Sequence, residues 1–242
     1  MKDYLIDVNK RLEFIKSAVQ DSGTNGIIFA NSGGKDCALV GILSKMACAN
    51  TVSLCLPCGI KRSYDEDLRD AIDLTEKFDI ENRVIDLAET HKTFVQLLSR
   101  SGNITDQAQS NIAPRLRMMT LYTIGLSEGL LVAGTSNRSE LHLGYFTKWG
   151  DGAYDFNPIA DLTATEVLEF LRYFGAPTQI IEKSPSAGLF EGQTDEADLG
   201  ITYASLDRYL TMGQTTPADM EIIKRHHTTT AHKRKLPLMY PH

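Results

Sequence analysis

The sequence contains no long hydrophobic run, no excess of positive charge and few cysteines, and each of these absences excludes a class of protein. The longest apolar stretches, such as residues 38–43, fall far short of the roughly 20 residues that a membrane-spanning helix needs. The opening residues, Met-Lys-Asp-Tyr, lack the basic start and the apolar middle of a secretory signal. We therefore expect a cytoplasmic protein with no membrane partner.

The charge balance argues against a protein whose main role is to bind nucleic acid. The chain carries 25 Lys and Arg against 31 Asp and Glu, a net charge of −6, whereas nucleic-acid-binding domains are usually basic. Its 18 Gly and 8 Pro are too few for a collagen-like or low-complexity chain. A length of 242 residues, of which 42% are hydrophobic, suits one globular domain with small additions.

The four cysteines lie close together, at Cys37, Cys48, Cys55 and Cys58. In a reducing compartment we expect them to be free thiols, or else metal or redox ligands. Cys55 and Cys58 form a Cys-x-x-Cys pair at the end of an apolar run, where small buried cysteines are also common. Both interpretations of this pair stay open.

Hydrophobic spacing predicts alternating strands and helices. Short apolar runs without a helical period predict buried strands at 26–30, 51–56, 83–87 and 130–134. Apolar residues three and four positions apart predict helices at 5–19, 36–47, 90–98 and 113–127. We expect the first helix to end near the glycine at position 23.

Three further helix starts are indicated by their capping residues. Ser63 with Glu66, and Thr163 with Glu166, have the spacing of capping boxes. The second of these helices is expected to end at Gly175. Thr216 followed by proline has the pattern of the N-cap and first residue of a last helix.

This alternation predicts the fold class. Strands separated by helices favour parallel strands joined by right-handed crossovers. We expect a three-layer α/β/α domain, a doubly wound parallel sheet of the Rossmann-like kind, with helical additions at the C-terminus. Such folds bind ligands beyond the carboxyl ends of the strands, and residues 32–37 and 135–155 follow two of these ends.

The first of these segments, Ser32-Gly-Gly-Lys-Asp36, has the composition of a phosphate-binding loop. Two glycines let backbone amides approach an anion, and the helix N-terminus adds partial positive charge. It is not a Walker A loop, because Phe29 and Asp36 stand where that motif needs Gly and Ser or Thr. A carboxylate beside phosphates makes sense with a cation between them, so Asp36 predicts a Mg²⁺ ligand. The alternative is a tight turn with Asp36 as an ordinary acid of the first helical turn.

The loop resembles the Ser-Gly-Gly-x-Asp-Ser motif of the N-type ATP pyrophosphatases, with Cys37 in place of the last serine. Those enzymes cleave ATP between the α and β phosphates, activate a substrate as its adenylate and release pyrophosphate. The resemblance implies a fold of the adenine nucleotide alpha hydrolase type, with ATP as co-substrate and Mg²⁺ as cofactor.

The second segment, Gly134 to Asp155, is long and has no helical or strand period. Loops of this length are usually functional or disordered, and its aromatic residues argue against disorder. It closely resembles the segment of ammonia-dependent NAD⁺ synthetases that reads Gly-Thr-x-x-x-x-Glu and then Gly-x-x-Thr-Lys-Tyr-Gly-Asp. The resemblance spans roughly residues 26–236 and includes matching motifs at 111–118, 184–189, 192–196, 199–203 and 232–234.

The resemblance implies a role for each matching residue. Contacts with ATP are implied for Ala30, Asn31, Ser32, Gly33, Gly34, Lys35, Asp36, Cys37, Thr135 and Ser186. Asp36 and Glu140 would bind Mg²⁺. Contacts with the substrate, nicotinate adenine dinucleotide (deamido-NAD), are implied for Arg115, Lys148, Asp155, His232 and Lys233.

Several of these residues also have an ordinary interpretation. Arg115 and Arg117 have the pattern of solvated helix charges, and Glu140 that of a surface acid. Asp151, between two glycines, has the pattern of a turn residue. Residues 232–235 have the composition of a frayed basic tail.

The implied reaction is an amidation driven by ATP. The nicotinate carboxylate would attack the α phosphate, pyrophosphate would leave, and ammonia would displace AMP to give NAD⁺. Positioning and electrostatics supply most of the rate in such chemistry, and the catalytic candidates are Asp36, Glu140, Lys148 and Asp151. Asp151 and Asp155 are the candidates for the group that takes a proton from ammonium, and Asp151 is favoured.

The family is a homodimer with the dinucleotide site near the subunit interface. We therefore expect a homodimer that acts on deamido-NAD, ATP and ammonia, and no nucleic acid partner. Glutamine-dependent relatives carry an additional N-terminal amidase domain, whereas here one predicted helix precedes the loop near residue 30. We expect a single NAD synthetase domain over residues 1–242, without a glutaminase domain.

Two other functions fit part of the sequence. Ser-Gly-Gly-Lys-Asp is common in ATP pyrophosphatases that thiolate tRNA, some of which hold an iron–sulfur cluster through Cys-x-x-Cys, as Cys55 and Cys58 would. A nucleotide-sensing module without turnover is the second alternative. The acidic chain and the segment from Gly134 to Asp155 argue against the first alternative. The joint presence of Asp36, Glu140, Lys148 and Asp155 argues against the second.

One position departs from the family pattern. Relatives commonly carry a lysine, thought to contact ATP phosphate, in a stretch like Asp-Leu-x-Lys-Thr, where this chain has Ala164. Lys35 stands inside the glycine loop, where synthetases often have an uncharged residue. We expect Lys35 either to restore the missing charge beside the phosphates or to point to solvent.

Overall fold

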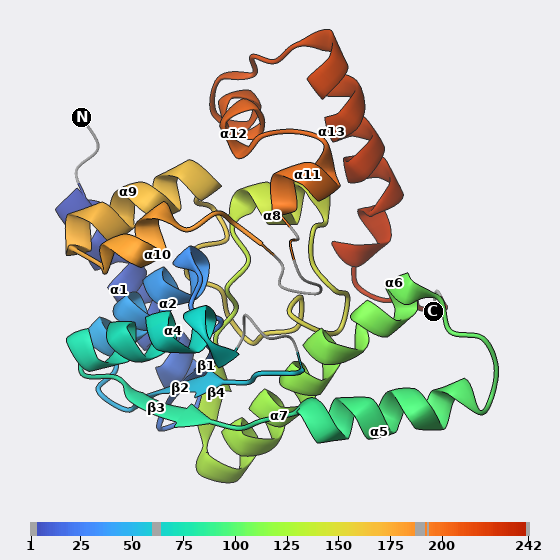
Figure 1. Ribbon diagram of the computed structural model, residues 1–242. Helices are drawn as coiled ribbons and strands as arrows, with labels where there is room; N and C mark the ends of the chain where they lie inside the picture. The colour runs from blue at the N-terminus through green and yellow to red at the C-terminus, as the bar shows by residue number, and fades with distance from the viewer. Residues whose placement is uncertain (1–3, 60–63, 187–191, 193, 241–242) are drawn as a thin grey trace.

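A parallel sheet lies at the centre of the computed structural model, which describes residues 4–59, 64–186, 192 and 194–240 (Figure 1). Its strands are β1 (Gly26–Ala30), β2 (Thr51–Cys55), β3 (Glu81–Val84) and β4 (Leu130–Val132), in the order β3-β2-β1-β4. Every neighbouring pair is parallel. The chain winds outward from β1 to β3 and then returns to place β4 on the other side of β1. The topological switch point, where such folds bind ligands, therefore lies between β1 and β4.

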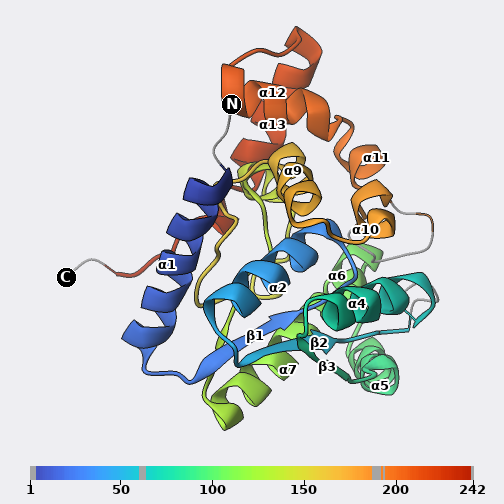
Figure 2. The same cartoon turned by 90° about the vertical axis from the view of Figure 1, so that its left-hand side faces the viewer.

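Helices cover both faces of the sheet, as Figures 1 and 2 show from two directions. One face carries α1 (Tyr4–Ser22), α2 (Lys35–Ala47), α4 (Glu66–Lys77), α9 (Ala164–Phe174) and α10 (Thr178–Glu182). The other carries α5 (Ala88–Ser99) and α7 (Ile112–Glu128), which follows the short α6 (Asp106–Ser110). Strand β1 is buried between the layers: Ile27 and Phe29 enter one core and Ile28 the other.

The C-terminal part adds a smaller helical cluster to this domain. It consists of α8 (Arg138–Leu143), α11 (Asp195–Leu199), α12 (Tyr203–Met212), α13 (Pro217–Thr229) and a 3₁₀ turn at Ala231–Lys233. These helices share an apolar core that includes Leu143, Leu206 and Ile223. The predicted three-layer α/β/α architecture with C-terminal helical additions is confirmed.

Most predicted helix limits are confirmed by their caps. The side chain of Thr163 accepts the N–H of Glu166 at the start of α9, and Gly175 ends that helix with a left-handed φ of 65°. Thr216 caps α13, with proline in the first turn. The first helix ends at Ser22, immediately before the glycine expected to stop it.

Three details of the prediction are wrong. The third strand is Glu81–Val84 rather than 83–87, because as an edge strand it is half exposed and shows no apolar run. Glu66 is the first residue of α4, whose N-cap Asp65 makes no side-chain capping bond; Ser63 lies outside the described residues. The segment after Gly134 contains the helix α8, which is too short to show a hydrophobic period.

Within the described ranges, no helix combines the length and the apolar character needed to cross a membrane.

Candidate active site

The glycine loop follows β1 and ends where α2 begins, at the switch point of the sheet. Gly33 has a φ of 69°, and a Cβ there would lie 2.2 Å from the backbone oxygen of Asp67, so only glycine fits. Asn31 fixes the turn because its side chain accepts the Gly33 N–H over 3.0 Å and donates to Ser53 Oγ over 3.2 Å. The first N–H groups of α2 follow directly and suit an anion such as phosphate.

Asn137 joins Asp36 of α2 to Glu140 of α8. Its side-chain amide donates to Asp36 Oδ1 over 3.0 Å, and its backbone N–H donates to Glu140 Oε2 over 3.1 Å. The Glu140 N–H donates back to Asn137 Oδ1, which completes the capping box of α8. The two carboxylates are thereby held close together, and burial together with the charge of Asp36 raises the pKa of Glu140 well above its ordinary value.

This pair of carboxylates fits a magnesium ion. Mg²⁺ prefers oxygen ligands and is commonly held by one or two carboxylates together with phosphate and water. A divalent cation would also relieve the repulsion that raises the pKa of Glu140. Among the described residues, no group of three or more His, Cys, Asp or Glu side chains could hold a metal. Phosphate and water oxygens would therefore have to complete the shell around Asp36 and Glu140.

Lys35 turns inward, toward the same carboxylates. Its side chain is 6% exposed, and its Nζ lies 2.5 Å from Asp36 Oδ2 and 5.4 Å from the centre of the Tyr203 ring. Burial disfavours the ammonium, but the charges of Asp36, Glu140 and Asp195 outweigh it and raise the pKa of Lys35. The expectation that Lys35 points to solvent is wrong.

A pocket of about 470 Å³ opens beside the glycine loop. Many residues expected to contact ATP, Mg²⁺ or substrate line it: Ala30, Asn31, Ser32, Gly34, Lys35, Asp36, Cys37, Thr135, Glu140, Asp151, Ser186 and Lys233. Gly33 is not among the lining residues, and its role is to form the turn. The glycine loop and part of the segment from Gly134 to Asp155 therefore share one cavity.

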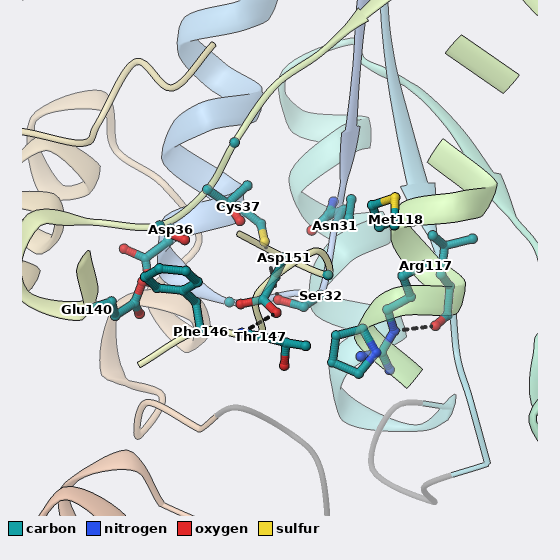
Figure 3. A pocket seen from close by; sticks show the side chains of 18 of the residues that line it. Asn31, Ser32, Asp36, Cys37, Arg117, Met118, Glu140, Phe146, Thr147 and Asp151 are labelled. Carbon is teal, nitrogen blue, oxygen red and sulfur yellow. Dashed lines mark hydrogen bonds between the residues drawn. The ribbon is translucent and has the colours of Figure 1, made fainter. Parts of the chain in front are cut away.

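Asp151 lies on the wall of this pocket formed by the turn at 147–152, near Phe146 (Figure 3). Its Oδ1 accepts the backbone N–H of Thr147 over 3.0 Å. Gly150 and Gly152 shape the turn, since both donate their N–H to the Thr147 oxygen. The side chain is open to solvent through the pocket, but protein atoms crowd around it, and this burial raises its pKa.

Arg117 also enters the pocket, which sequence reasoning did not anticipate. Its Nε donates to the backbone oxygen of Leu56 over 3.0 Å, and burial lowers its pKa. In the view of Figure 3 it lies on the other side of Asp151 from Asp36 and Glu140. The prediction of a solvated helix charge is wrong for Arg117. Arg115 and Arg117 are two positions apart on α7, and no sequence pattern distinguishes the one in the pocket from the one on the surface.

Four of the five residues expected to bind the dinucleotide lie near one another. Arg115 is exposed on α7 and donates to the backbone oxygen of Lys148 over 3.3 Å. Lys148 Nζ in turn donates to the backbone oxygen of His232 over 2.9 Å. Lys233 donates to the oxygens of Gly144 and Phe146 over 2.8 and 2.7 Å. Residues 232 and 233 are therefore anchored at the pocket and do not form a frayed tail.

Asp155 lies apart from that group. It accepts the Tyr122 hydroxyl over 3.1 Å and the Val132 N–H over 2.9 Å, so it faces α7 at the end of β4. It is not among the residues that line the pocket.

Lys183, at the end of α10, also contacts the glycine loop and was not expected there. Its Nζ lies 2.7 Å from Asp67, 2.6 Å from Asp70 and 3.4 Å from the backbone oxygen of Gly33. These contacts join α10 and α4 over the glycine turn, near the pocket residue Ser186.

The cysteines are free thiols with ordinary polar neighbours. Cys55 Sγ donates to Asn82 Oδ1 over 3.3 Å, and burial raises its pKa to about 11. Cys58 Sγ donates to the Leu87 oxygen at 3.9 Å. Such environments favour unreactive thiols. Cys37 lies in the first turn of α2, and its Sγ is 3.3 Å from Ser32 Oγ of the glycine loop.

Comparison with known proteins gives a consistent family. The model of the family described as NAD synthase matches residues 7–241. An NH3-dependent NAD⁺ synthetase of Carboxydothermus hydrogenoformans is 40% identical over 231 residues, which cover 94% of each chain. Another from Archaeoglobus fulgidus is 41% identical over 206 residues, 84% of this chain and 81% of that protein.

Solved structures agree with this family. An NMN synthetase from Francisella tularensis has a TM-score of 0.93 and 33% identity, and the alignment covers 99% of both chains. An NH3-dependent NAD synthetase from Campylobacter jejuni has a TM-score of 0.82 and 30% identity, and the alignment covers 100% of both chains.

The carboxylate pair yields a direct prediction. Asp36→Asn and Glu140→Gln each remove one charge from the pair and keep the side-chain shape. We expect each to lower the release of pyrophosphate from ATP by about a hundredfold or more, because charge stabilisation of the leaving phosphates is lost. Pyrophosphate release is measured over a range of Mg²⁺ concentrations. Near wild-type rates at limiting Mg²⁺ in either variant would remove that residue from the metal site.

Proposed function

The chain belongs to the NAD synthase family, and we propose that it is an ammonia-dependent NAD⁺ synthetase, a ligase that uses ATP to convert deamido-NAD into NAD⁺. The observation that carries this proposal is the shared pocket, which is lined by the glycine loop, by the pair Asp36 and Glu140, and by Asp151 and Lys233. Family membership favours this function over tRNA thiolation and over a sensor without turnover.

In the first step, an oxygen of the nicotinate carboxylate attacks the α phosphorus of ATP. The bond to the β phosphate breaks, and pyrophosphate leaves with the electron pair. The amides of residues 33–35 and the start of α2 are suited to bind the phosphates. Asp36 and Glu140 would hold Mg²⁺, which supplies charge neutralisation at the leaving group when bound.

In the second step, ammonia attacks the carbonyl carbon of the mixed anhydride and AMP leaves. Ammonia is mostly ammonium at neutral pH, so the site needs a group that attracts the cation and takes its proton. We assign this role to Asp151 rather than Asp155. The support is that Asp151 lines the pocket and has a raised pKa, whereas Asp155 is held by Tyr122 and Val132 outside it.

The substrate has its own set of candidate contacts. Arg117 and Lys233 place positive charge in the pocket, where a phosphate or the nicotinate carboxylate would bind. Arg115, Lys148 and His232 lie beside one another near the pocket and are assigned to the rest of the dinucleotide. Asp155 accepts the Tyr122 hydroxyl of α7 outside the pocket lining, so we do not assign it to the dinucleotide.

A second candidate function is the amidation of nicotinate mononucleotide to NMN. The observation that favours it is the close structural match to the NMN synthetase of Francisella tularensis. The same adenylation chemistry would act on a shorter substrate, which lacks the adenosine half that Arg115 and Lys148 are assigned to bind. The curated relatives, at about 40% identity, favour the dinucleotide.

A homodimer is also proposed, with α5 and α7 at its interface. Large apolar side chains are exposed on both helices: Phe94 (41%), Leu97 (56%), Met119 (55%) and Leu126 (88%). Met119 and Leu126 are seven residues apart and therefore share one face of α7. Exposed apolar patches of this kind mark interaction sites. We also propose a cytoplasmic location, which the use of ATP and the free thiols support.

The decisive assay varies the nitrogen source and the acceptor. The protein is incubated with ATP, Mg²⁺, either ammonium or glutamine, and either deamido-NAD or nicotinate mononucleotide. Mass spectrometry then measures NAD⁺ and NMN. We expect NAD⁺ from deamido-NAD and ammonium, with the higher kcat/KM for the dinucleotide. A higher kcat/KM for the mononucleotide would favour the second candidate, and efficient turnover of glutamine without ammonium would contradict ammonia dependence.

The role of Asp151 predicts a split between the two steps. Asp151→Asn is expected to lower NAD⁺ formation by about a hundredfold or more and to retain the exchange of pyrophosphate into ATP that depends on deamido-NAD. The base is the carboxylate form, so wild-type amidation should fall as the pH falls through the raised pKa of Asp151, above the range of an ordinary aspartate. Asp155→Asn is the matched control, and the same split in that variant would assign the proton acceptor to Asp155 instead.

The proposed interface predicts the effect of one charge. Leu126→Glu should shift the protein from dimer to monomer in sedimentation equilibrium, because the glutamate would have to be desolvated at the interface. Leu5→Glu, at an exposed apolar position of α1 on the other side of the sheet, is the control and should leave the dimer intact. A monomeric wild type, or a Leu126→Glu dimer of unchanged stability, would contradict this interface.

A further inference from the structure

Lys35 brings a positive charge to the place where the proposed function needs Mg²⁺. Asp36 has two carboxylate oxygens, and both are engaged. Oδ1 accepts the amide of Asn137 over 3.0 Å, and Oδ2 lies 2.5 Å from Lys35 Nζ. A metal ion that binds Asp36 through Oδ2 therefore competes with the ammonium of Lys35.

The surroundings of the ammonium are acidic and well enclosed. Asp36 is 15% exposed on its side chain, Asp195 of α11 is 4% exposed, and Glu140 of α8 is partly buried. The negative charges of all three raise the pKa of Lys35. The Tyr203 ring, which lies under the ammonium, donates its hydroxyl to Asp195 Oδ2 over 3.0 Å. Carboxylates from three separate helices thus act electrostatically on one lysine, and one of them, Asp36, contacts it directly.

The charges of this cluster do not balance with lysine alone. With all three carboxylates ionised, one ammonium leaves an excess of negative charge, and the raised pKa of Glu140 reflects burial together with this cost. One divalent cation in addition to Lys35 would bring the sum to zero. Both Lys35 and a divalent cation would therefore stabilise the cluster. Asp36 Oδ2 cannot contact the Lys35 ammonium and the metal ion at the same time unless one of them moves.

We propose that the Lys35 ammonium holds Asp36 in the nucleotide-free protein and moves to the phosphates when ATP brings Mg²⁺ to Asp36 and Glu140. Lys35 is then a tethered cation that lowers the affinity of the empty site for Mg²⁺ and raises the affinity of the site for ATP. The identity of the nucleotide in this proposal rests on the proposed function. The competition between Lys35 and Mg²⁺ does not depend on it.

Ala164 is consistent with this arrangement. It is 2% exposed at the start of α9 and belongs to the same apolar cluster as Tyr203, the residue beneath the Lys35 ammonium. Alanine adds no positive charge at this position.

The test measures Mg²⁺ binding without nucleotide or substrate. Isothermal titration calorimetry with MgCl₂ is performed on the wild type, on Lys35→Gln and on Lys35→Met, which keeps an unbranched stem over Tyr203. We expect both variants to bind Mg²⁺ more tightly than the wild type by about tenfold or more, the value of one charge-assisted contact. They should also bind the non-hydrolysable analogue α,β-methylene-ATP more weakly by a similar factor.

Lys45→Gln is the matched control. Lys45 lies on the same helix, pairs with the exposed Asp79 and is not among the residues that line the pocket. Its removal changes the net charge equally, so Mg²⁺ affinity should stay at the wild-type value. An equal gain in the Lys45 variant would show a general charge effect and overturn the proposal, as would an unchanged Mg²⁺ affinity in Lys35→Gln and Lys35→Met.

Folding of the variants is part of the same test. Thermal unfolding is recorded with EDTA and with saturating Mg²⁺. We expect Mg²⁺ to raise the Tm of the Lys35 variants more than that of the wild type, because it replaces the lost cation. Variants that fold only with Mg²⁺ would support the proposal, and variants that fail to fold under both conditions would contradict it. Because no turnover is measured, these outcomes are independent of whether the chain makes NAD⁺.

Discussion

The close approach of Asp36 and Glu140 is the constraint around which the site is organised. Burial and the repulsion between the two carboxylates both raise the pKa of Glu140. Asn137 opposes the repulsion, since it bonds to both side chains and caps α8. The parallel neighbours β1 and β4 bring the two helices to the same edge of the sheet. The topology therefore places two acids together that are 104 positions apart in the chain.

Much of the fold was predictable because its signals are local. The buried strand at 26–30, the helix limits at Ser22 and Gly175 and the cap at Thr163 all follow from hydrophobic period and capping residues. The predicted limits of strand β3 were wrong because this edge strand is partly exposed and therefore has no run of apolar residues. The helix α8 was missed although Asn137 and Glu140 have the spacing of a capping box, because the six residues that follow Asn137 are too few for a period.

The site was less predictable, because its geometry depends on distant contacts. The resemblance to a family located most pocket residues, but it gave no basis for separating Arg115, which is exposed, from Arg117, which enters the pocket. The inward position of Lys35 depends on Asp195 and Tyr203, more than 150 residues away in the chain. No local pattern around Lys35 contains that information.

The C-terminal helices explain why the sheet alone would not form this site. They supply Asp195 and Tyr203 near Lys35, and they also supply Lys233, which donates to the backbone oxygens of Gly144 and Phe146. The result is a pocket lined by the acidic pair beside the glycine loop, by Asp151 and by the positive side chains Arg117 and Lys233. In Figure 3, Asp151 lies between the acidic pair and Arg117. An adenylation brings a carboxylate to a phosphate, so both anions must be neutralised, and the incoming ammonium then needs a negative group near the carbonyl carbon. The pocket contains charges of both signs that suit these needs, and it requires both the sheet and the added helices to be in place.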